Sequence, residues 1–414
     1  MIKESIENTN LTAGWEMKDL GDICRFQNGF AFKSKTYKDE GIPLVRITKI
    51  QDELIDLSKL VYIDPKDYNK DLSKYEIVKD DLLIAMSGAT TGKIAIHKSE
   101  KVLLLNQRVG KFKPSDNLNK TYLLNFLKTK VEESLAISAG AAQPNLSTDQ
   151  IRSFRIPFPP LPQQKQIVSI LDKAFAAIDR AKANAEQNLQ NAKELFESYL
   201  QNVFENKGDD WEEKTLQEVC HKITDGTHQT PKYFDEGVIF LSSRNVTSGK
   251  INWDKIKYID EKQHIEMHKR VAPKIGDILL AKNGTTGVAA MVDKDVVFDI
   301  YVSLAHIRSL GSVNPEFLLY FINSPVAKKQ FNNRLKGAGV PNLHLKEIRE
   351  VVINFPKSIG DQKQIVKKLD SLSAETKKLE VIYTQKIADL EEMKKSVLQK
   401  AFSGQLNTIN ESYE

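Results

Sequence analysis

The chain has 414 residues, of which 41% are hydrophobic, so it is too long for one domain and apolar enough for two folded cores. Its 60 Lys and Arg residues slightly exceed its 55 Asp and Glu residues, which permits a polyanionic partner without requiring one. Residues 1–14 are polar and lack the apolar stretch of a signal peptide, and no run is long enough to span a bilayer. We therefore expect a cytoplasmic protein with no membrane partner.

The two cysteines, Cys24 and Cys220, are 196 residues apart, which is the offset of an internal repeat described below. We therefore expect both to be small buried residues at the end of a first strand, one in each half of the chain. We identify no Cys-x-x-Cys pair and no Cys/His cluster of metal-ligand spacing, and expect no metal site.

Residues 15–160 alternate short β-rich runs with clusters of Gly, Asp, Asn and Ser, a pattern typical of strands joined by turns. The runs that most favour strands are residues 42–47, 82–86, 93–97, 102–105 and 155–158. Among them we predict a helix around Lys120 to Ser138. A long helix is predicted from 163 to 207, directly after a group of prolines.

The second half of the chain repeats the first. Trp15-Glu16 matches Trp211-Glu212 at an offset of 196. Further matches join Gly41–Val45 to 237–241, Asp81–Ala85 to 277–281, Pro144–Leu146 to 341–343, and 163–172 to 361–370. The second half is therefore predicted to contain the same strands, a helix around Pro315 to Leu335, and a second long helix from 361 to 403.

Both long helices carry apolar residues at alternating steps of three and four, which draws one stripe along a helix that is otherwise polar. Each helix therefore needs one partner helix, and a coiled coil is the expected pairing. The residues expected in this coiled coil, or in the docking of partners on it, are Gln166, Ile167, Leu171, Ile178, Leu189, Gln364, Ile365, Leu369, Leu379 and Leu390.

We find no motif that would carry catalysis. The segment Ser87 to Lys93 is similar to a phosphate-binding loop, but it has one residue too few between its glycines, so a tight turn between two strands is the preferred interpretation. Phe158 stands where adenine methyltransferases carry Asp or Asn before Pro-Pro, so prolines that end a strand explain Phe158 to Leu161 better. We therefore predict that the chain is not an enzyme.

Polar residues that can read base edges concentrate in the two β-rich regions. Arg, Lys, Asn and Gln make bidentate contacts with purines, and Ser and Thr donate or accept hydrogen bonds. The candidate DNA-binding residues are Arg46, Thr48, Lys49, Asn106, Gln107, Arg108, Ser242, Ser243, Arg244, Asn245, Lys282 and Asn283.

Two variable regions, each headed by Trp-Glu and followed by a Gln-Lys-Gln-Ile-Val helix, resemble the specificity subunit of type I restriction-modification enzymes. The most specific matching motifs are residues 159–167, 276–287 and 398–406. The resemblance implies an α+β fold, with two tandem target-recognition domains in pseudo-twofold repeat, separated by two long helices that form the antiparallel coiled coil. The segments would be domain 1 (1–162), a spacer helix (163–207), domain 2 (208–357), and a second spacer helix with the C-terminal tail (358–414).

The resemblance also implies that each domain reads one half of an asymmetric bipartite site on double-stranded DNA. Two methyltransferase (modification) subunits would dock on the helices, and motor-nuclease (restriction) subunits would join them. S-adenosylmethionine, ATP and Mg²⁺ are expected on those partner subunits and not on this chain. The alternatives are a structural coiled-coil adaptor without DNA specificity, which would bind no duplex, and a stand-alone enzyme, which would turn over a substrate when purified alone.

Overall fold

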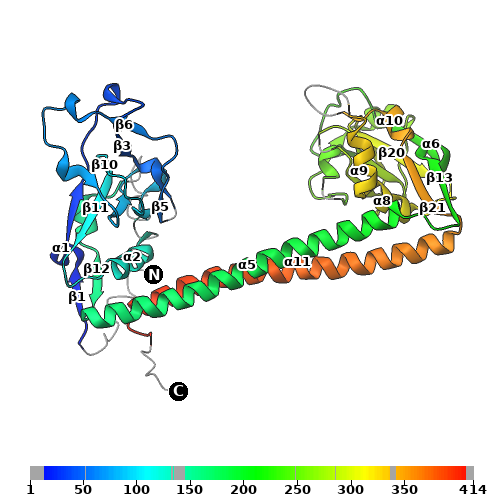
Figure 1. The fold of residues 1–414 in the computed structure, drawn as a ribbon. Helices are drawn as coiled ribbons and strands as arrows, with labels where there is room; N and C mark the ends of the chain where they lie inside the picture. The colour runs from blue at the N-terminus through cyan, green and yellow to red at the C-terminus, as the bar shows by residue number, and fades with distance from the viewer. Residues whose placement is uncertain are drawn as a thin grey trace, which may run out of the picture. The chain divides into compact units, whose positions relative to one another are not determined.

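A computed structural model describes residues 14–51, 53–131, 134, 145–247, 249–284, 286–335 and 342–406 (Figure 1). Pro144, Thr285, Pro341 and the end of the helix predicted to reach Ser138 lie outside the described residues. The chain folds into two compact units: unit 1 comprises Met1–Asn184 and Lys386–Glu414, and unit 2 comprises Ala185–Gln385. Each unit contains an α+β globule and parts of both long helices, so the predicted fold class is confirmed.

The globule of unit 1 is built from short strands and helices. Its strands are β1 (Glu16–Asp19), β2 (Cys24–Asn28), β3 (Ile42–Val45), β4 (Ile50–Gln51), β5 (Leu54–Ile55), β6 (Val61–Ile63), β7 (Glu76–Ile77), β8 (Leu82–Ala85), β9 (Ile94–Ile96), β10 (Leu103–Leu105), β11 (Val109–Pro114) and β12 (Arg155–Phe158). Its helices are α1 (Leu20–Ile23), α2 (Lys120–Thr129) and α4 (Thr148–Arg152), with 3₁₀ turns η1 (Ser34–Thr36), η2 (Ile47–Lys49), η3 (Pro65–Asp67), η4 (Ser73–Tyr75) and η5 (Gly88–Thr90).

The globule of unit 2 repeats most of these elements. Its strands are β13 (Trp211–Thr215), β14 (Cys220–Asp225), β15 (Val238–Leu241), β16 (Lys257–Ile259), β17 (Ile278–Ala281), β18 (Ala289–Met291), β19 (Phe298–Ile300), β20 (Leu304–Ser309) and β21 (Val352–Pro356). Its helices are α6 (Leu216–Val219), α7 (Glu261–His268), α8 (Pro315–Asn323), α9 (Pro325–Asn332) and α10 (Leu345–Arg349), with the turn η6 (Ser243–Asn245).

The sheets confirm the repeat. In unit 1 one sheet has the order β2-β11-β8-β9 and another the order β6-β3-β10-β7, and in unit 2 the corresponding orders are β14-β20-β17-β18 and β16-β15-β19. In each unit the second sheet contains one parallel pair, β3 with β10 or β15 with β19. The terminal strands of each globule also pair antiparallel, β1 with β12 and β13 with β21.

A central strand in each unit divides the core in two. Leu82 and Ile84 of β8 face one apolar cluster, and Leu83 and Ala85 face the other, because successive side chains of a strand point to opposite faces. Strand β17 does the same in unit 2. These strands are therefore buried on both faces, which explains their uninterrupted apolar sequences.

The aspartate before each central strand is an anchor. Asp81 accepts hydrogen bonds from the backbone of Val78 at 2.9 Å and from Lys111 Nζ at 3.1 Å. In unit 2, Asp277 accepts bonds from the backbone of Lys274 at 2.7 Å and from Arg308 Nη2 at 2.6 Å. The repeated aspartate thus fixes the turn that enters the strand and neutralises a cation on the neighbouring one.

The long helices are α5 (Leu161–Glu205) and α11 (Ile359–Phe402), as predicted within two residues at each end. Within unit 1 they run antiparallel, because Lys182 pairs with Glu391 at 2.6 Å and Asp179 with Lys394 at 2.8 Å. The end of each helix enters the core of a globule: Phe402 contacts Tyr122 and Phe126 in unit 1, and Phe204 contacts Phe317 and Phe321 in unit 2.

Three local predictions differ from the structure. The helix predicted around Pro315 to Leu335 is two helices, α8 and α9, because Ser324 caps a new helix whose first residue, Pro325, has no N–H to donate. Cys24 and Cys220 begin β2 and β14 after a helical turn instead of ending a first strand, although both are buried, which raises the pKa of each thiol to about 12. Leu379, expected in the apolar stripe, is 37% exposed.

Candidate nucleic-acid interface

In unit 1 the loops that follow β3, β8 and β10 meet. Because β3 and β10 are parallel, the loops that follow them leave the sheet at the same edge. Asn106 donates its backbone N–H to the carbonyl of Val45 at 3.2 Å. The backbone of Met86, at the end of β8, donates to Arg108 at 2.9 Å. The predicted groups 46–49 and 106–108 are therefore brought together, next to the turn at 87–92.

The turn after β8 is held against the loop after β3. Thr90 Oγ1 donates to the carbonyl of Ile47 at 3.1 Å, and β8 pairs with β9 on either side of the turn. This confirms the prediction of a tight turn between two strands.

The predicted residues of unit 1 differ in how available they are. Thr48, Gln107 and Arg108 are exposed, and Arg46 is half-buried beside the ring of Tyr37. Lys49 is committed to Asp56 at 2.9 Å, and Asn106 is buried. The first group can contact a ligand, whereas Lys49 and Asn106 shape the loops.

Unit 2 forms the same edge with different side chains. Tyr301 donates its backbone N–H to Leu241 at 2.8 Å, and Lys282 donates its backbone N–H to Ser303 at 3.0 Å. Ser243 donates its backbone N–H to Ser303 Oγ at 3.0 Å. The groups 242–245 and 282–283 are therefore brought together with residues 301–303. Residues 301–303 were not among the predicted site residues, although they match residues 106–108 at an offset of 195.

A close approach of backbones explains one glycine in each unit. A Cβ atom on Gly29 would lie 2.1 Å from the carbonyl oxygen of Asn106, and one on Gly226 would lie 1.9 Å from that of Ile300. No other residue fits where these loops cross the edge of the sheet.

Lys282 does not present a free ammonium at this edge. Its side chain is 6% exposed, and Nζ lies 3.3 Å from the buried carboxylate of Asp225, which also pairs with Arg270 and His228. Burial alone would raise the pKa of Asp225, but Arg270 and Lys282 outweigh it and hold that pKa below its usual range. Lys282 therefore contributes to the internal structure of the loop, and a direct contact with DNA stays a prediction.

Other predicted residues of unit 2 also build the edge. Asn245 is buried, accepts the backbone N–H of Ser242 at 2.9 Å and donates to Lys255 at 3.0 Å. Asn283 is half-buried, and its Oδ1 atom has no hydrogen-bond partner among the described residues. Arg244 is the exposed member of this group.

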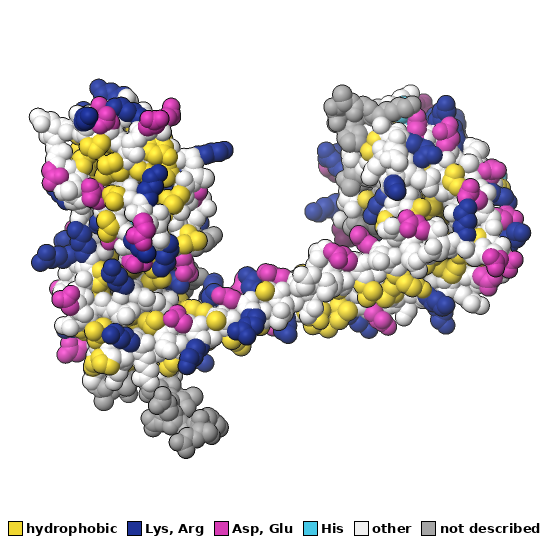
Figure 2. All heavy atoms as spheres, in the orientation of Figure 1, with side chains coloured by type: hydrophobic (Ala, Val, Ile, Leu, Met, Phe, Trp, Pro, Cys, Tyr) yellow, Lys and Arg dark blue, Asp and Glu magenta, His cyan; other side chains and the backbone are white. Residues whose placement is uncertain are grey.

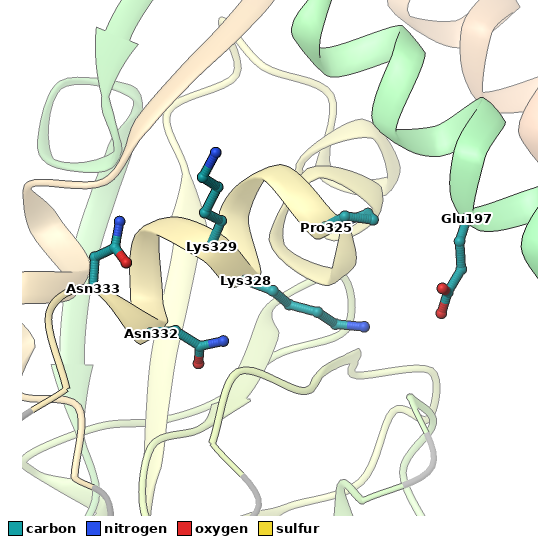
Figure 3. A pocket seen from close by; sticks show the side chains of 6 residues that line it. All are labelled: Glu197, Pro325, Lys328, Lys329, Asn332 and Asn333. Atoms are coloured by element: carbon teal, nitrogen blue, oxygen red, sulfur yellow. The ribbon is translucent and has the colours of Figure 1, made fainter.

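Figure 2 shows Lys and Arg side chains interspersed with acidic ones over both globules. In unit 2, α9 and α5 also border an open hollow of about 420 Å³ (Figure 3). Its lining residues are Glu197, Pro325, Lys328, Lys329, Asn332 and Asn333. Most of these side chains are polar, and they include two lysines and one glutamate.

The start of each long helix contains two glutamines, and the sequence alone did not predict which of the two is buried. Gln164 and Gln362 are fully buried, whereas Gln166 and Gln364, which were predicted to bind partners, are exposed. Of the other residues predicted on these helices, Ile167, Leu171, Ile178 and Leu369 are buried, and Leu189, Ile365 and Leu390 are half-buried. The repeat at an offset of 198 was the available signal for the buried glutamines.

The fold thus consists of two related units, each with a loop surface at the end of a parallel strand pair. The sequence matches the family described as "Type I restriction modification DNA specificity domain" over residues 12–190 and again over 208–389. The EcoBI specificity subunit of Escherichia coli is 24% identical, covering 98% of this chain and 89% of the relative. The MjaVIII specificity subunit of Methanocaldococcus jannaschii is 25% identical, covering 96% and 94%.

Solved structures have the same fold. A chain from a structural study of complex assembly and conformational transition of the type I R-M system has a TM-score of 0.76 and 19% identity, covering 96% of this chain and all of that one. The HsdS subunit from Thermoanaerobacter tengcongensis has a TM-score of 0.62 and 17% identity, covering 98% and 100%. The chain belongs to the family of type I restriction-modification specificity subunits, which are non-catalytic and recognise DNA sequence. Among the described residues, no helix is both long and apolar enough to cross a membrane.

Proposed function

We propose that each unit reads one half of an asymmetric bipartite DNA target with the loops after its parallel strands. The observation that carries this proposal is that the same edge recurs with different side chains. Gln107 and Arg108 of unit 1 correspond to Val302 and Ser303 of unit 2 through the shared backbone hydrogen bonds. Because the side chains differ, the two half-sites differ in sequence.

The long helices are the proposed docking surface for partner subunits. Exposed Gln166 and Gln364 occur at equivalent places near the two helix starts, which supports one methyltransferase subunit at each. Restriction subunits then join this assembly, in the cytoplasm where the DNA lies. S-adenosylmethionine, ATP and Mg²⁺ are bound by the partners.

The test is to map methylated adenines in cells that express the methyltransferase partner with the wild-type chain, with Arg244→Ala, or without the chain. The wild type should give one asymmetric bipartite motif that disappears without the chain. Because Arg244 is exposed in unit 2, Arg244→Ala should relax or weaken recognition at one half-site by about 1–3 kcal/mol, leaving the other half unchanged.

Thr48→Ala is the matched control, because Thr48 occupies the corresponding exposed position in unit 1. It should affect only the opposite half-site. A motif in which both halves change in either variant would contradict the division of labour between the units. If the chain binds no duplex in a gel shift, alone or with its partner, the result would favour the alternative of a structural adaptor without DNA specificity.

A further inference from the structure

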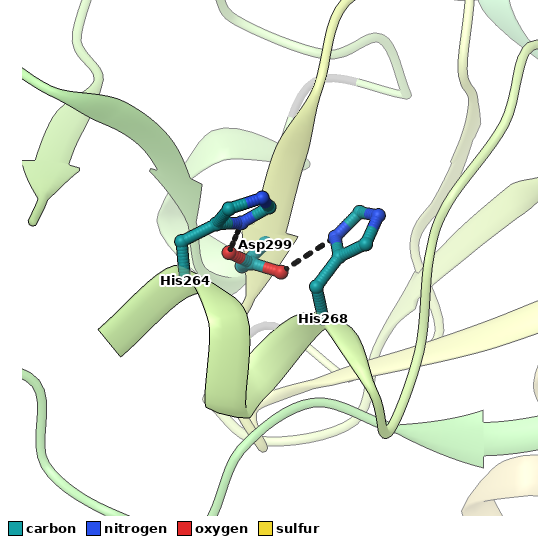
Figure 4. Close-up of side chains that lie close together, drawn as sticks. All are labelled: His264, His268 and Asp299. Atoms are coloured by element: carbon teal, nitrogen blue, oxygen red, sulfur yellow. Dashed lines mark hydrogen bonds and ion pairs between the residues drawn. The ribbon is translucent and has the colours of Figure 1, made fainter. Parts of the chain in front are cut away.

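Two histidines and an aspartate gather in unit 2, on α7 and β19, outside the loops of the candidate interface. His264 Nδ1 lies 2.7 Å from Asp299 Oδ2, and His268 Nδ1 lies 3.0 Å from Asp299 Oδ1 (Figure 4). Both histidines extend from α7 toward the same carboxylate on β19. We propose that His264, His268 and Asp299 bind a divalent transition-metal ion, with Zn²⁺ as the representative ion.

The local fold explains how the three side chains converge. His264 and His268 are four residues apart on α7, so they lie on one face of the helix. Asp299 points to the side of the sheet opposite Phe298 and Ile300, because side chains alternate along a strand. The sequence therefore contained a His-x-x-x-His spacing that the expectation of no metal-ligand spacing had missed.

The carboxylate lacks a permanent positive partner. The side chain of Asp299 is 1% exposed, and among the residues that the structure describes its hydrogen-bonding partners are the two imidazoles. A carboxylate this deeply buried is costly unless a positive charge compensates it. An imidazole carries a positive charge only when it is protonated, whereas a bound divalent ion would supply both the charge and the coordination.

The ligand set and its geometry fit a transition metal. One ring nitrogen from each histidine and one carboxylate oxygen lie within 4.8 Å of one another. Ligand atoms that each lie about 2.0–2.2 Å from one shared ion are closer to one another than 4.8 Å. Small rotations of the side chains would therefore bring the three atoms into coordinating positions. Imidazole nitrogens with one carboxylate favour Zn²⁺ and its neighbours over Mg²⁺ or Ca²⁺.

The site is reachable, and the matching position of unit 1 lacks a ligand. The side chain of His268 is 32% exposed, which gives an ion a route in and leaves a coordination position for water. Asp299 of β19 pairs with Phe240 of β15. In unit 1 the equivalent residue of β10 is Leu104, which pairs with Leu44 of β3 and is buried and apolar. Because the part of the chain that the structure describes contains one such cluster, we expect one ion per chain.

A bound ion would stabilise the elements that support the candidate interface of unit 2. An ion would tie α7 to β19, and Tyr301, two residues after Asp299, begins the loop that crosses the interface edge. Met267 of α7 and Tyr301 also pack against the same small apolar cluster. Binding should therefore raise the thermal unfolding temperature of unit 2.

The test uses the full chain without a histidine tag, stripped with a chelator and dialysed. Zn²⁺ is titrated against a chromophoric indicator, and Co²⁺ binding is followed by its visible absorption. We expect one equivalent bound with micromolar or tighter affinity. Affinity should fall at least tenfold in His268→Ala and in Asp299→Asn, while His221→Ala, an exposed histidine of the same unit, should bind like the wild type.

Two outcomes would overturn the proposal. One is the absence of stoichiometric Zn²⁺ binding by the wild-type chain at micromolar concentrations. The other is equal binding by the wild type and His268→Ala, with circular dichroism showing that both are folded. DNA and partner subunits are absent from the titration, so either result leaves the proposed recognition function untouched.

Discussion

Single buried polar side chains tie each long helix to its globule. Gln362 accepts the backbone N–H of Asn314 at 2.7 Å and donates to the carbonyls of Ser312 at 3.1 Å and Pro356 at 2.7 Å. Gln362→Ala leaves these groups without partners and should destabilise unit 2 by about 2–3 kcal/mol. Urea unfolding followed by the fluorescence of Trp211 and Trp253 measures this loss.

Exposed Gln364, two residues further along the helix, is the control. Gln364→Ala should change the free energy of unfolding by less than about 0.5 kcal/mol, because the side chain is exposed. Equal destabilisation by both substitutions would show that the hydrogen bonds of Gln362 do not anchor the helix. The equivalent pair in unit 1, Gln164 and Gln166, should behave in the same way.

The ion cluster around Asp277 makes the stability of unit 2 depend on pH. Burial alone would raise the pKa of Asp277, but hydrogen bonds from Arg308 and His306 hold that pKa well below its usual range. A carboxyl whose folded-state pKa is lowered stabilises the fold above its ordinary pKa of about 4, and this stabilisation is lost as the pH falls below that value.

Asp277→Asn should therefore cost about 3 kcal/mol at pH 7, since it leaves Arg308 without its anion. The difference from the wild type should shrink as the pH is lowered from about 4. Urea unfolding at several pH values measures it, with exposed Asp295→Asn as the control. A difference that stays constant down to pH 3 would show that another group carries the effect.

At the scale of elements, local periodicity and the repeat predicted the strands and the long helices, and the family resemblance supplied the antiparallel pairing of those helices. Whether two residues of the same type are buried or exposed could not be predicted in the same way. Gln164 and Gln166 differ only in which one faces the loop before α2, and the burial of Lys282 depends on Asp225, which is distant in the sequence. Helix α7 belongs to the part of unit 2 that differs from unit 1, so the repeat gave no guide to it.

The exposed apolar residues of α11 carry the next prediction, which rests on the proposed docking of partners. Val381 is 70% exposed, and Ile382 and Leu195 of unit 2 are also exposed; Figure 2 shows apolar atoms along this part of the helices. Val381→Asp should leave folding unchanged and weaken assembly with the methyltransferase subunit at least tenfold, as measured by native mass spectrometry.

Lys378→Asp is the control for charge, because Lys378 is exposed on the same helix without being apolar. It should weaken assembly less than Val381→Asp. Unchanged assembly in Val381→Asp would move the docking surface elsewhere on the chain.

At the scale of the whole molecule, the chain crosses from one compact unit to the other twice, within α5 and within α11. If these helices set the number of unread base pairs between the half-sites, lengthening both should change that number. The ion pairs 179 with 394 and 182 with 391 place residue 188 opposite residue 385. Four residues inserted after Asn188 and four after Gln385 therefore extend both helices at facing positions.

Four residues add about 6 Å of helix, which corresponds to one or two base-pair steps of about 3.4 Å. They also turn each helix by about 400°, close to a full turn, so the apolar stripes stay nearly in register. The variant should fold and methylate both half-sites with one or two more base pairs between them. Two-residue insertions turn each stripe by about 200° away from its partner and should abolish folding or assembly. Sequencing the methylated sites decides the matter, since an active four-residue variant with an unchanged gap would mean that the helices do not set the spacing.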